Sequence, residues 1–148
     1  MDRIDSFRGK FRFLSNFYPC AITFGGLTYA SSEAAFQAQK CAREEDKRRY
    51  AQLTNPLRAK QLGRRETLPA DWDAISYEIM DAILHVKFAD PTLARLLKET
   101  GDAYIEEGNH WHDNLWGNCT CDRCRDQVGH NQLGRILMGI RDELNRVA

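Results

Sequence analysis

The hydrophobic and polar positions of this chain follow a strand pattern near the N-terminus and helical patterns over most of the remaining length. Ile22-Thr23-Phe24 and Leu27-Thr28-Tyr29 are β-rich runs joined by Gly25-Gly26, which predicts an antiparallel hairpin with a two-glycine turn. After the hairpin, the spacing of apolar residues and the turn signals predict helices over about 32–41, 43–49, 56–63, 74–90, 92–100 and 132–145. The stretch 43–49 is charged and reads as a solvated continuation of the helix before it.

Capping residues place the boundaries of these helices. Ser31 or Ser32 is the predicted N-cap of the first helix, and Asn55-Pro56 starts a short helix that Gly63 ends. Asp71 or Asp73 caps the long helix, and Asn131 caps the last one. The apolar residues predicted to face inward are Ile75, Ile79, Ile83 and Val86 in the long helix, and Leu133, Leu137, Ile140 and Leu144 in the last.

Length and composition favour one domain that spans residues 1–148. The chain has no repeat, linker or composition shift, so we expect a mainly α, single compact helical domain with a small antiparallel hairpin or sheet. Its 21 basic and 21 acidic residues balance, which argues against tight non-specific binding of nucleic acid. The apolar runs are too short for a membrane span, and an odd count of five cysteines without an export signal predicts reduced thiols and a cytoplasmic protein.

The segment SSEAAFQAQK, residues 31–40, carries a polar row at helical spacing. Glu33, Gln37 and Lys40 fall within about 60° of one another on a helix. One interpretation is a solvent-facing row in which Glu33 complements the helix dipole. The other is a set of groups that face a substrate.

Two aromatic segments are candidates for ligand contact. In FRFLSNFYP, residues 11–19, Phe13 could stack on a base while Arg12 and Asn16 reach a phosphate or ribose, although core packing of the rings is the simpler interpretation. In HWHDNLWG, residues 110–117, the two tryptophans could wall a pocket or cover the core.

Two further features suggest ions. Three thiols at C-x-C-x-x-C, Cys119, Cys121 and Cys124, could bind zinc with His130 or His112 as fourth ligand. Because paired C-x-x-C knuckles are missing, we favour a reduced thiol-rich loop and expect neither a metal nor a cofactor. The helix start at Asn131, with Gly134 in its first turn, could hold a phosphate or be an ordinary capped core helix.

Several ordered motifs resemble the NADAR/YbiA-like proteins. These are FLSNFYP, TY before SSEAAFQAQK, KF at 87–88, DNLWG at 113–117 and GHNQLGRILMGIR. They cover nearly the full chain. Where many members have histidine after the helix glutamate, this chain has Ala34, and its cysteine-rich insert at 119–124 also departs from the simplest pattern.

The resemblance implies an N-glycosidase, a hydrolase that cleaves the bond between ribose C1 and an amine nitrogen. Its implied substrates are phosphoribosylamino intermediates of riboflavin synthesis or ADP-ribosylated guanine. ADP-ribosylated DNA would make the protein an antitoxin that reverses ADP-ribosylation by a cognate ADP-ribosyltransferase toxin. A module that binds ADP-ribose or an NAD derivative without turnover is the alternative.

The resemblance also links the glutamate and lysine of the helix to catalysis, which maps to Glu33 and Lys40. We expect Glu33 to act as acid/base and Lys40 to form a Schiff base with the opened sugar. The expected substrate-binding residues are Arg12, Phe13, Asn16, Gln37, Trp111, Asp113, Trp116, Gly117, Asn131 and Gly134.

Overall fold

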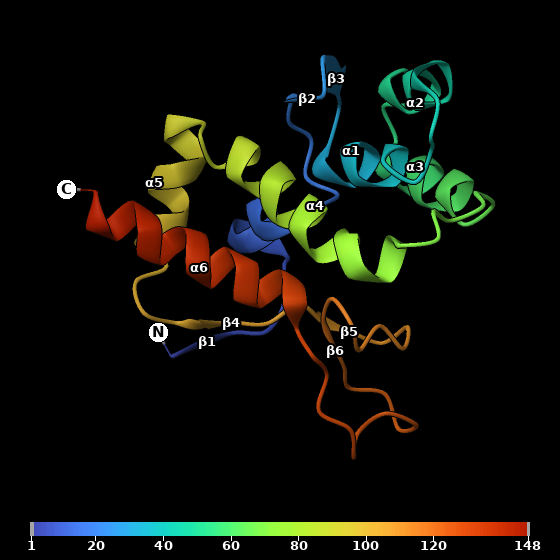
Figure 1. Cartoon of the computed structure of the whole chain (residues 1–148). Coiled ribbons are helices and arrows are strands. Elements are labelled where there is room, and N and C mark those ends of the chain that lie inside the picture. The colour runs from blue at the N-terminus through green and yellow to red at the C-terminus, as the bar shows by residue number, and fades with distance from the viewer. Residues whose placement is uncertain (1, 148) are drawn as a thin grey trace. The chain divides into compact units, whose positions relative to one another are not determined.

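The computed structural model describes residues 2–147, which form two compact units. Unit 1 contains the chain up to Ser15 and from Asp90 onward, and unit 2 contains Asn16–Ala89. Helices dominate both units, and the strands form small two-stranded sheets (Figure 1). The predicted fold class is therefore confirmed.

Unit 2 begins with the predicted hairpin. Strand β2 (Ile22–Phe24) pairs antiparallel with β3 (Leu27–Tyr29). Gly25 and Gly26, at φ 60° and 84°, occupy the left-handed backbone region that the tight turn requires. Helix α1 (Ser32–Ala38) follows the hairpin and contacts α2 (Glu44–Ala51), α3 (Pro56–Gly63) and α4 (Trp72–Lys87). Helix α1 is thus the centre of its unit.

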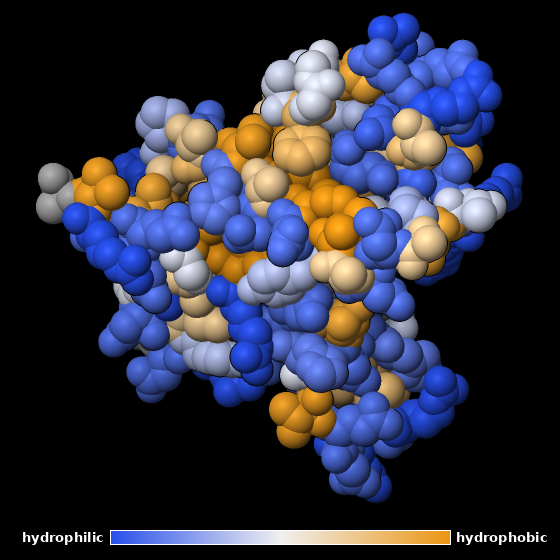
Figure 2. All heavy atoms as spheres, viewed as in Figure 1, coloured by the Kyte–Doolittle hydropathy of each residue, from blue (hydrophilic) through white to orange (hydrophobic). Residues whose placement is uncertain are grey.

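Two boundaries differ from the predicted helix over 32–41. Helix α1 ends at Ala38, because the Gln39 amide donates to the Ala35 carbonyl at 2.9 Å and the Gln39 N–H turns to Phe36. Lys40 therefore lies in the turn after α1. The charged stretch does not continue this helix but forms the separate helix α2, whose outer surface is hydrophilic (Figure 2).

The apolar stripe predicted for α4 is wrong in part. Ile83 is buried, but Val86 is exposed and Ile75 and Ile79 are only half-buried. The buried residues of the helix are Trp72, Ser76, Met80, Ile83, Leu84 and Lys87. The Trp72 ring, the Met80 thioether and the hydrocarbon chain of Lys87 form much of this buried face. A stripe of aliphatic residues therefore does not predict it.

Unit 1 contains a 3₁₀ helix, η1 (Gly9–Leu14), and the helices α5 (Pro91–Glu99) and α6 (Gln132–Arg146). Two sheets are parallel pairs: β1 (Arg3–Ile4) with β4 (Tyr104–Ile105), and β5 (Gly108–Asn109) with β6 (Asn118–Cys119). Both pairs differ in this respect from the antiparallel hairpin of unit 2.

Helices α5 and α6 pack on each other in unit 1. Leu133, Leu137 and Ile140 are buried as predicted, and Leu144 is half-buried. An open groove of about 520 Å³ lies between the two helices, and it contains none of the candidate site residues. Within residues 2–147, no helix combines the length and apolar character needed to cross a membrane.

Candidate active site

The polar row of α1 lies inside the protein. Glu33 is 8% exposed and Gln37 6%, so the solvent-facing interpretation is wrong. The helix start is fixed by Ser31, whose hydroxyl accepts from the Ala34 N–H at 3.1 Å, and by Asn16, whose carbonyl accepts from the Glu33 N–H at 3.0 Å. The Ser32 hydroxyl donates to the Asn16 side-chain oxygen at 2.8 Å. Two segments therefore set the position of Glu33.

Gln37 has an unused hydrogen-bond acceptor. Its side-chain oxygen Oε1 is buried and has no hydrogen-bond partner within the described chain. The side chain packs on Gly63, where a Cβ would collide with the amide. A buried acceptor without a donor costs free energy. A hydroxyl or amine of a bound ligand would satisfy it.

Lys40 extends this row beyond the end of α1. Its Nζ lies 3.5 Å from the Gly63 carbonyl oxygen and 5.9 Å from the centroid of the Trp72 ring, which also contacts Phe36 at 5.3 Å between centroids. Burial lowers the pKa of Lys40, and the negative charge of Glu33 opposes part of this effect. A lowered pKa increases the share of neutral amine, the nucleophilic form.

Unit 2 contains a second lysine with an unusual environment. Lys87, in the KF pair, is 1% exposed and lies among the rings of Tyr18 and Phe88, 5.8 and 5.3 Å from their centroids. Burial lowers its pKa to about 8. Its lowered pKa makes it the chemical rival of Lys40.

Asn16 belongs to the same unit as this row. Its side-chain oxygen accepts from Ser32, whereas its amide nitrogen donates to the Sδ of Met80, a weak acceptor, at 3.6 Å. This nitrogen can donate to a stronger acceptor such as a ribose hydroxyl. Sequence reasoning identified Asn16 and Gln37 as site residues but missed Trp72 and Gly63, which begin and end helices without a distinctive motif.

The other predicted binding residues belong to unit 1. Arg12 is exposed, whereas Phe13 is 4% exposed, which favours the core alternative for that ring. Trp111 is 52% exposed and Trp116 is half-buried. Ligand contact by Arg12 and the two tryptophans stays a prediction.

Within the loop, Asp113 and Gly117 have structural partners. The Asp113 carboxylate accepts from the N–H groups of Leu115 and Trp116 at 3.1 and 2.9 Å and so closes the turn. Gly117 has no room for a side chain because Glu107 and Asn109 fill that space. Both residues determine the conformation of the loop. This structural role explains them without any contact to a ligand.

At the start of α6, the structure favours the alternative of an ordinary capped helix over a phosphate site. The N–H groups of Gln132 and Leu133 donate to the carbonyls of Leu115 and Trp116 at 3.1 and 3.0 Å, so they are already occupied. The space beside Gly134 is filled by the Ile105 carbonyl and by the Asn131 side chain. The helix start is therefore satisfied by the protein itself.

Asn131 is not a side-chain cap, contrary to the prediction. It adopts φ 51°, and its buried side chain accepts from the Glu107 N–H at 3.0 Å and donates to the Ile105 carbonyl at 2.8 Å. These bonds tie α6 to the β4–β5 connection. A role in binding substrate is not supported.

Potential metal ligands converge in the cysteine-rich loop of unit 1. His112, Cys119, Cys121 and Cys124 place their ligand atoms within 4.8 Å of one another. Of the two histidines considered as fourth ligand, His112 is therefore the one in place, and His130 is outside the group.

Comparisons with known proteins agree on one family. The NADAR domain model matches residues 6–145. The chain is 31% identical over 133 residues to N-glycosidase YbiA of Escherichia coli, covering 88% of this chain and 79% of that protein. It is 32% identical over 139 residues to an N-glycosidase of Nostoc punctiforme, covering 90% and 85%.

Further matches extend the comparison. A riboflavin biosynthesis protein of Vibrio vulnificus is 38% identical over 139 residues, which are 92% of this chain but only 36% of that protein. The chain thus spans about a third of the Vibrio protein. The NMR structure of E. coli YbiA superposes with a TM-score of 0.80 at 29% identity, covering 98% of this chain and 86% of that one.

Proposed function

We propose a specific reaction for this chain, which belongs to the NADAR family of YbiA-like N-glycosidases. The reaction is hydrolysis of the bond between ribose C1 and an amine nitrogen, and the proposed substrate is a phosphoribosylamino intermediate of riboflavin synthesis. The single observation that carries the proposal is the row Glu33–Gln37–Lys40. Glu33 and Gln37 are buried, Lys40 is half-buried, and the Gln37 oxygen is an acceptor that no described protein group satisfies.

The row supplies the groups that this chemistry needs. Glu33 in its acid form donates a proton to the ring oxygen as the C1–O bond breaks, which leaves an iminium between C1 and the substrate nitrogen. Neutral Lys40 then adds to C1, and Glu33, now a carboxylate, carries a proton from the Lys40 nitrogen to the substrate nitrogen, which departs as the amine and leaves a protonated Schiff base on Lys40. Water adds to the resulting Lys40 Schiff base and releases the sugar as an aldehyde, restoring the free amine.

The neighbouring groups support these steps. The Gln37 oxygen can accept from a ribose hydroxyl, and the Asn16 amide can donate to one. Burial lowers the pKa of Lys40, which favours its neutral form. Lys40 and Gln37 both contact Gly63, and the charge of Glu33 acts on the Lys40 pKa, so one sugar could contact all three groups.

Two observations favour the riboflavin branch. Two relatives are named riboflavin biosynthesis proteins, that of Vibrio vulnificus and, over 88 residues, one from Zea mays. The zero net charge also suits a small substrate better than duplex DNA. ADP-ribosylated guanine is therefore the comparison substrate of the test.

The test measures release from both substrates with the full chain. We expect turnover of the phosphoribosylamino intermediate. Borohydride added during turnover should trap a sugar adduct that mass spectrometry places on Lys40. Lys40→Arg should bind substrate but trap nothing, because arginine retains the charge and is not a nucleophile at neutral pH. Lys47→Arg is the matched control, since Lys47 is another half-buried lysine of the same unit.

Each other outcome has a defined meaning. Faster turnover of ADP-ribosylated guanine would overturn the substrate assignment but retain the N-glycosidase. An adduct on Lys87 would transfer the nucleophile to that residue. Normal turnover by Lys40→Arg would leave direct attack by water. Stoichiometric binding of either substrate without release would contradict the enzyme altogether.

A further inference from the structure

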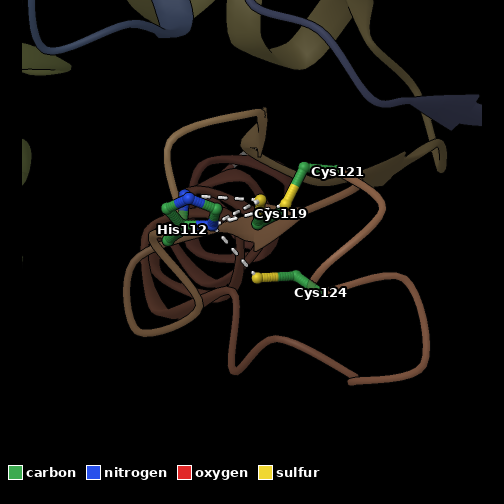
Figure 3. A group of neighbouring side chains, drawn as sticks. All are labelled: His112, Cys119, Cys121 and Cys124. Atoms are coloured by element: carbon green, nitrogen blue, oxygen red, sulfur yellow. Dashed lines mark hydrogen bonds between the residues drawn. The ribbon is translucent and has the colours of Figure 1, made fainter.

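Three cysteines and one histidine of unit 1 surround a common point. Figure 3 shows the side chains of His112, Cys119, Cys121 and Cys124 directed toward one another. The His112 ring nitrogen Nδ1 lies 3.3 Å from the Cys121 sulfur, 3.4 Å from that of Cys124 and 3.9 Å from that of Cys119. All three thiols are free of disulfides.

Hydrogen bonding alone does not account for this arrangement. An imidazole nitrogen has either one hydrogen or one lone pair in the ring plane, so Nδ1 cannot satisfy three sulfurs at once. A cation at the centre of the four atoms contacts all of them. The cluster therefore has the geometry of a coordination sphere.

The distances also match a particular ion. With Zn–S bonds of about 2.3 Å and Zn–N bonds of about 2.0–2.1 Å at a tetrahedral angle, nitrogen and sulfur are about 3.6 Å apart. The three observed distances, 3.3, 3.4 and 3.9 Å, lie on both sides of that value. Thiolate and imidazole ligands in a closed set of four are typical of structural zinc.

The surrounding loop holds the ligands in place. The His112 N–H donates to the Cys119 sulfur at 3.3 Å, a bond that stabilises a thiolate, and the Cys119 N–H donates to the Asn114 side chain at 2.8 Å. Cys119 and Cys124 are buried, at 1% and 5% exposed, while His112 adopts φ 69°. Two of the three thiols are thus sheltered from solvent, while Cys121 is half-buried and His112 is exposed.

We propose that His112, Cys119, Cys121 and Cys124 bind one structural Zn²⁺ that fixes the loop between β5 and α6. The ion joins two segments, the turn around His112 and the stretch 119–124. Four protein ligands leave no open position, so the zinc serves the conformation of the loop and not the glycosidase chemistry. This proposal replaces the expectation of no metal, which considered ligand spacing alone.

The test begins with the metal content of the full chain. Tag-free protein is expressed in zinc-containing medium and purified in reducing buffer. It should contain about one zinc per chain by inductively coupled plasma mass spectrometry. Cobalt replacement should give the visible absorption of tetrahedral Co²⁺ and thiolate-to-cobalt charge transfer. Iron in place of zinc, a disulfide within the cluster, or less than about a tenth of an equivalent with all thiols titratable would overturn the proposal.

Two pairs of variants separate ligation from general damage. His112→Asn and Cys124→Ser should lose zinc, whereas His110→Asn, two residues away in the same loop, and Cys20→Ser should keep it. His112→Cys should retain zinc through four thiolates and, with cobalt, gain charge-transfer intensity. This variant keeps the test decisive if the others fold poorly. Equal zinc loss from His110→Asn and His112→Asn would contradict the assignment of His112.

Discussion

The buried polar groups of the two units are used differently. In unit 1, the Arg141 guanidinium donates to the Thr100 hydroxyl at 2.9 Å and to the Ala103 carbonyl at 2.8 Å, and both ends of the Asn131 amide are bonded. In unit 2, Gln37 keeps a buried oxygen without a partner. Fully satisfied networks make a structure rigid, whereas an unsatisfied acceptor is tolerated where a ligand completes it.

The same contrast holds for the two side-chain clusters that could bind an ion or a substrate. The cysteine cluster of unit 1 has four ligands for one ion and no open position. The α1 row of unit 2 has a candidate acid, an unused acceptor and an amine of lowered pKa. We infer that unit 1 contributes conformation and that unit 2 contributes the bond-breaking groups.

The largest expected effect comes from Glu33→Gln in unit 2. The amide keeps the shape of the side chain but cannot transfer a proton, so kcat should fall by ~10²–10⁴-fold. Substrate binding, the helical circular dichroism and the zinc content should stay those of the wild type. The measurement is single-turnover release with saturating enzyme. Turnover near that of the wild type would return Glu33 to a helix-dipole role and weaken the contrast between the units.

Lys87→Met gives the second largest effect, on the pH dependence of stability. Folding lowers the pKa of Lys87 from 10.5 to about 8, so the unfolded state binds more protons between these values. The free energy of unfolding contributed by this residue therefore rises with pH from about 8 to 10.5, by roughly 3 kcal/mol in all. Below about pH 8 both states bind this proton, so the contribution of Lys87 no longer changes with pH. Lys87→Met should lack the rise.

The readout is the difference in unfolding free energy between wild type and variant, measured by denaturant titration across pH 7–10.5. This difference cancels the groups that oppose the rise, notably Cys41, whose pKa burial raises to about 11, and Tyr50, whose pKa burial also raises. Exposed Lys98→Met is the control. Parallel curves for Lys87→Met and wild type would show that Lys87 is charged and well solvated in the folded state.

Local signals explain what the sequence alone could predict. The Gly25-Gly26 turn, the Ser31 and Asn55 caps and the end of α3 at Gly63 each depend on neighbouring residues, and all are confirmed. The row of α1 was also predictable as a row, because helical periodicity fixes which residues share a face. Its burial was not, because that depends on how α1 packs on α2, α3 and α4.

Contacts between distant segments explain the failures. Trp72 reaches Lys40 across 32 positions, and the carbonyls that occupy the start of α6 come from Leu115 and Trp116. In the cysteine loop, spacing could not choose between His112 and His130, because the choice depends on a turn with φ 69° at His112. Such contacts leave no periodic trace in the sequence.

Removing the metal gives the smallest expected effect on catalysis. The groups assigned to bond breaking lie in unit 2, and the supports described for them, Asn16, Gly63 and Trp72, lie in that unit as well. Zinc removal by Cys124→Ser should therefore change kcat by less than about a factor of two, or under about 0.5 kcal/mol in activation free energy.

KM is the sensitive parameter, because His112 lies between Trp111 and Asp113, and a released loop would move both. A raised KM with unchanged kcat would mean that the loop contributes to substrate binding, and unchanged values of both would restrict it to conformation. A fall in kcat comparable to that of Glu33→Gln would contradict the division of labour between the units, provided that His110→Asn stays fully active.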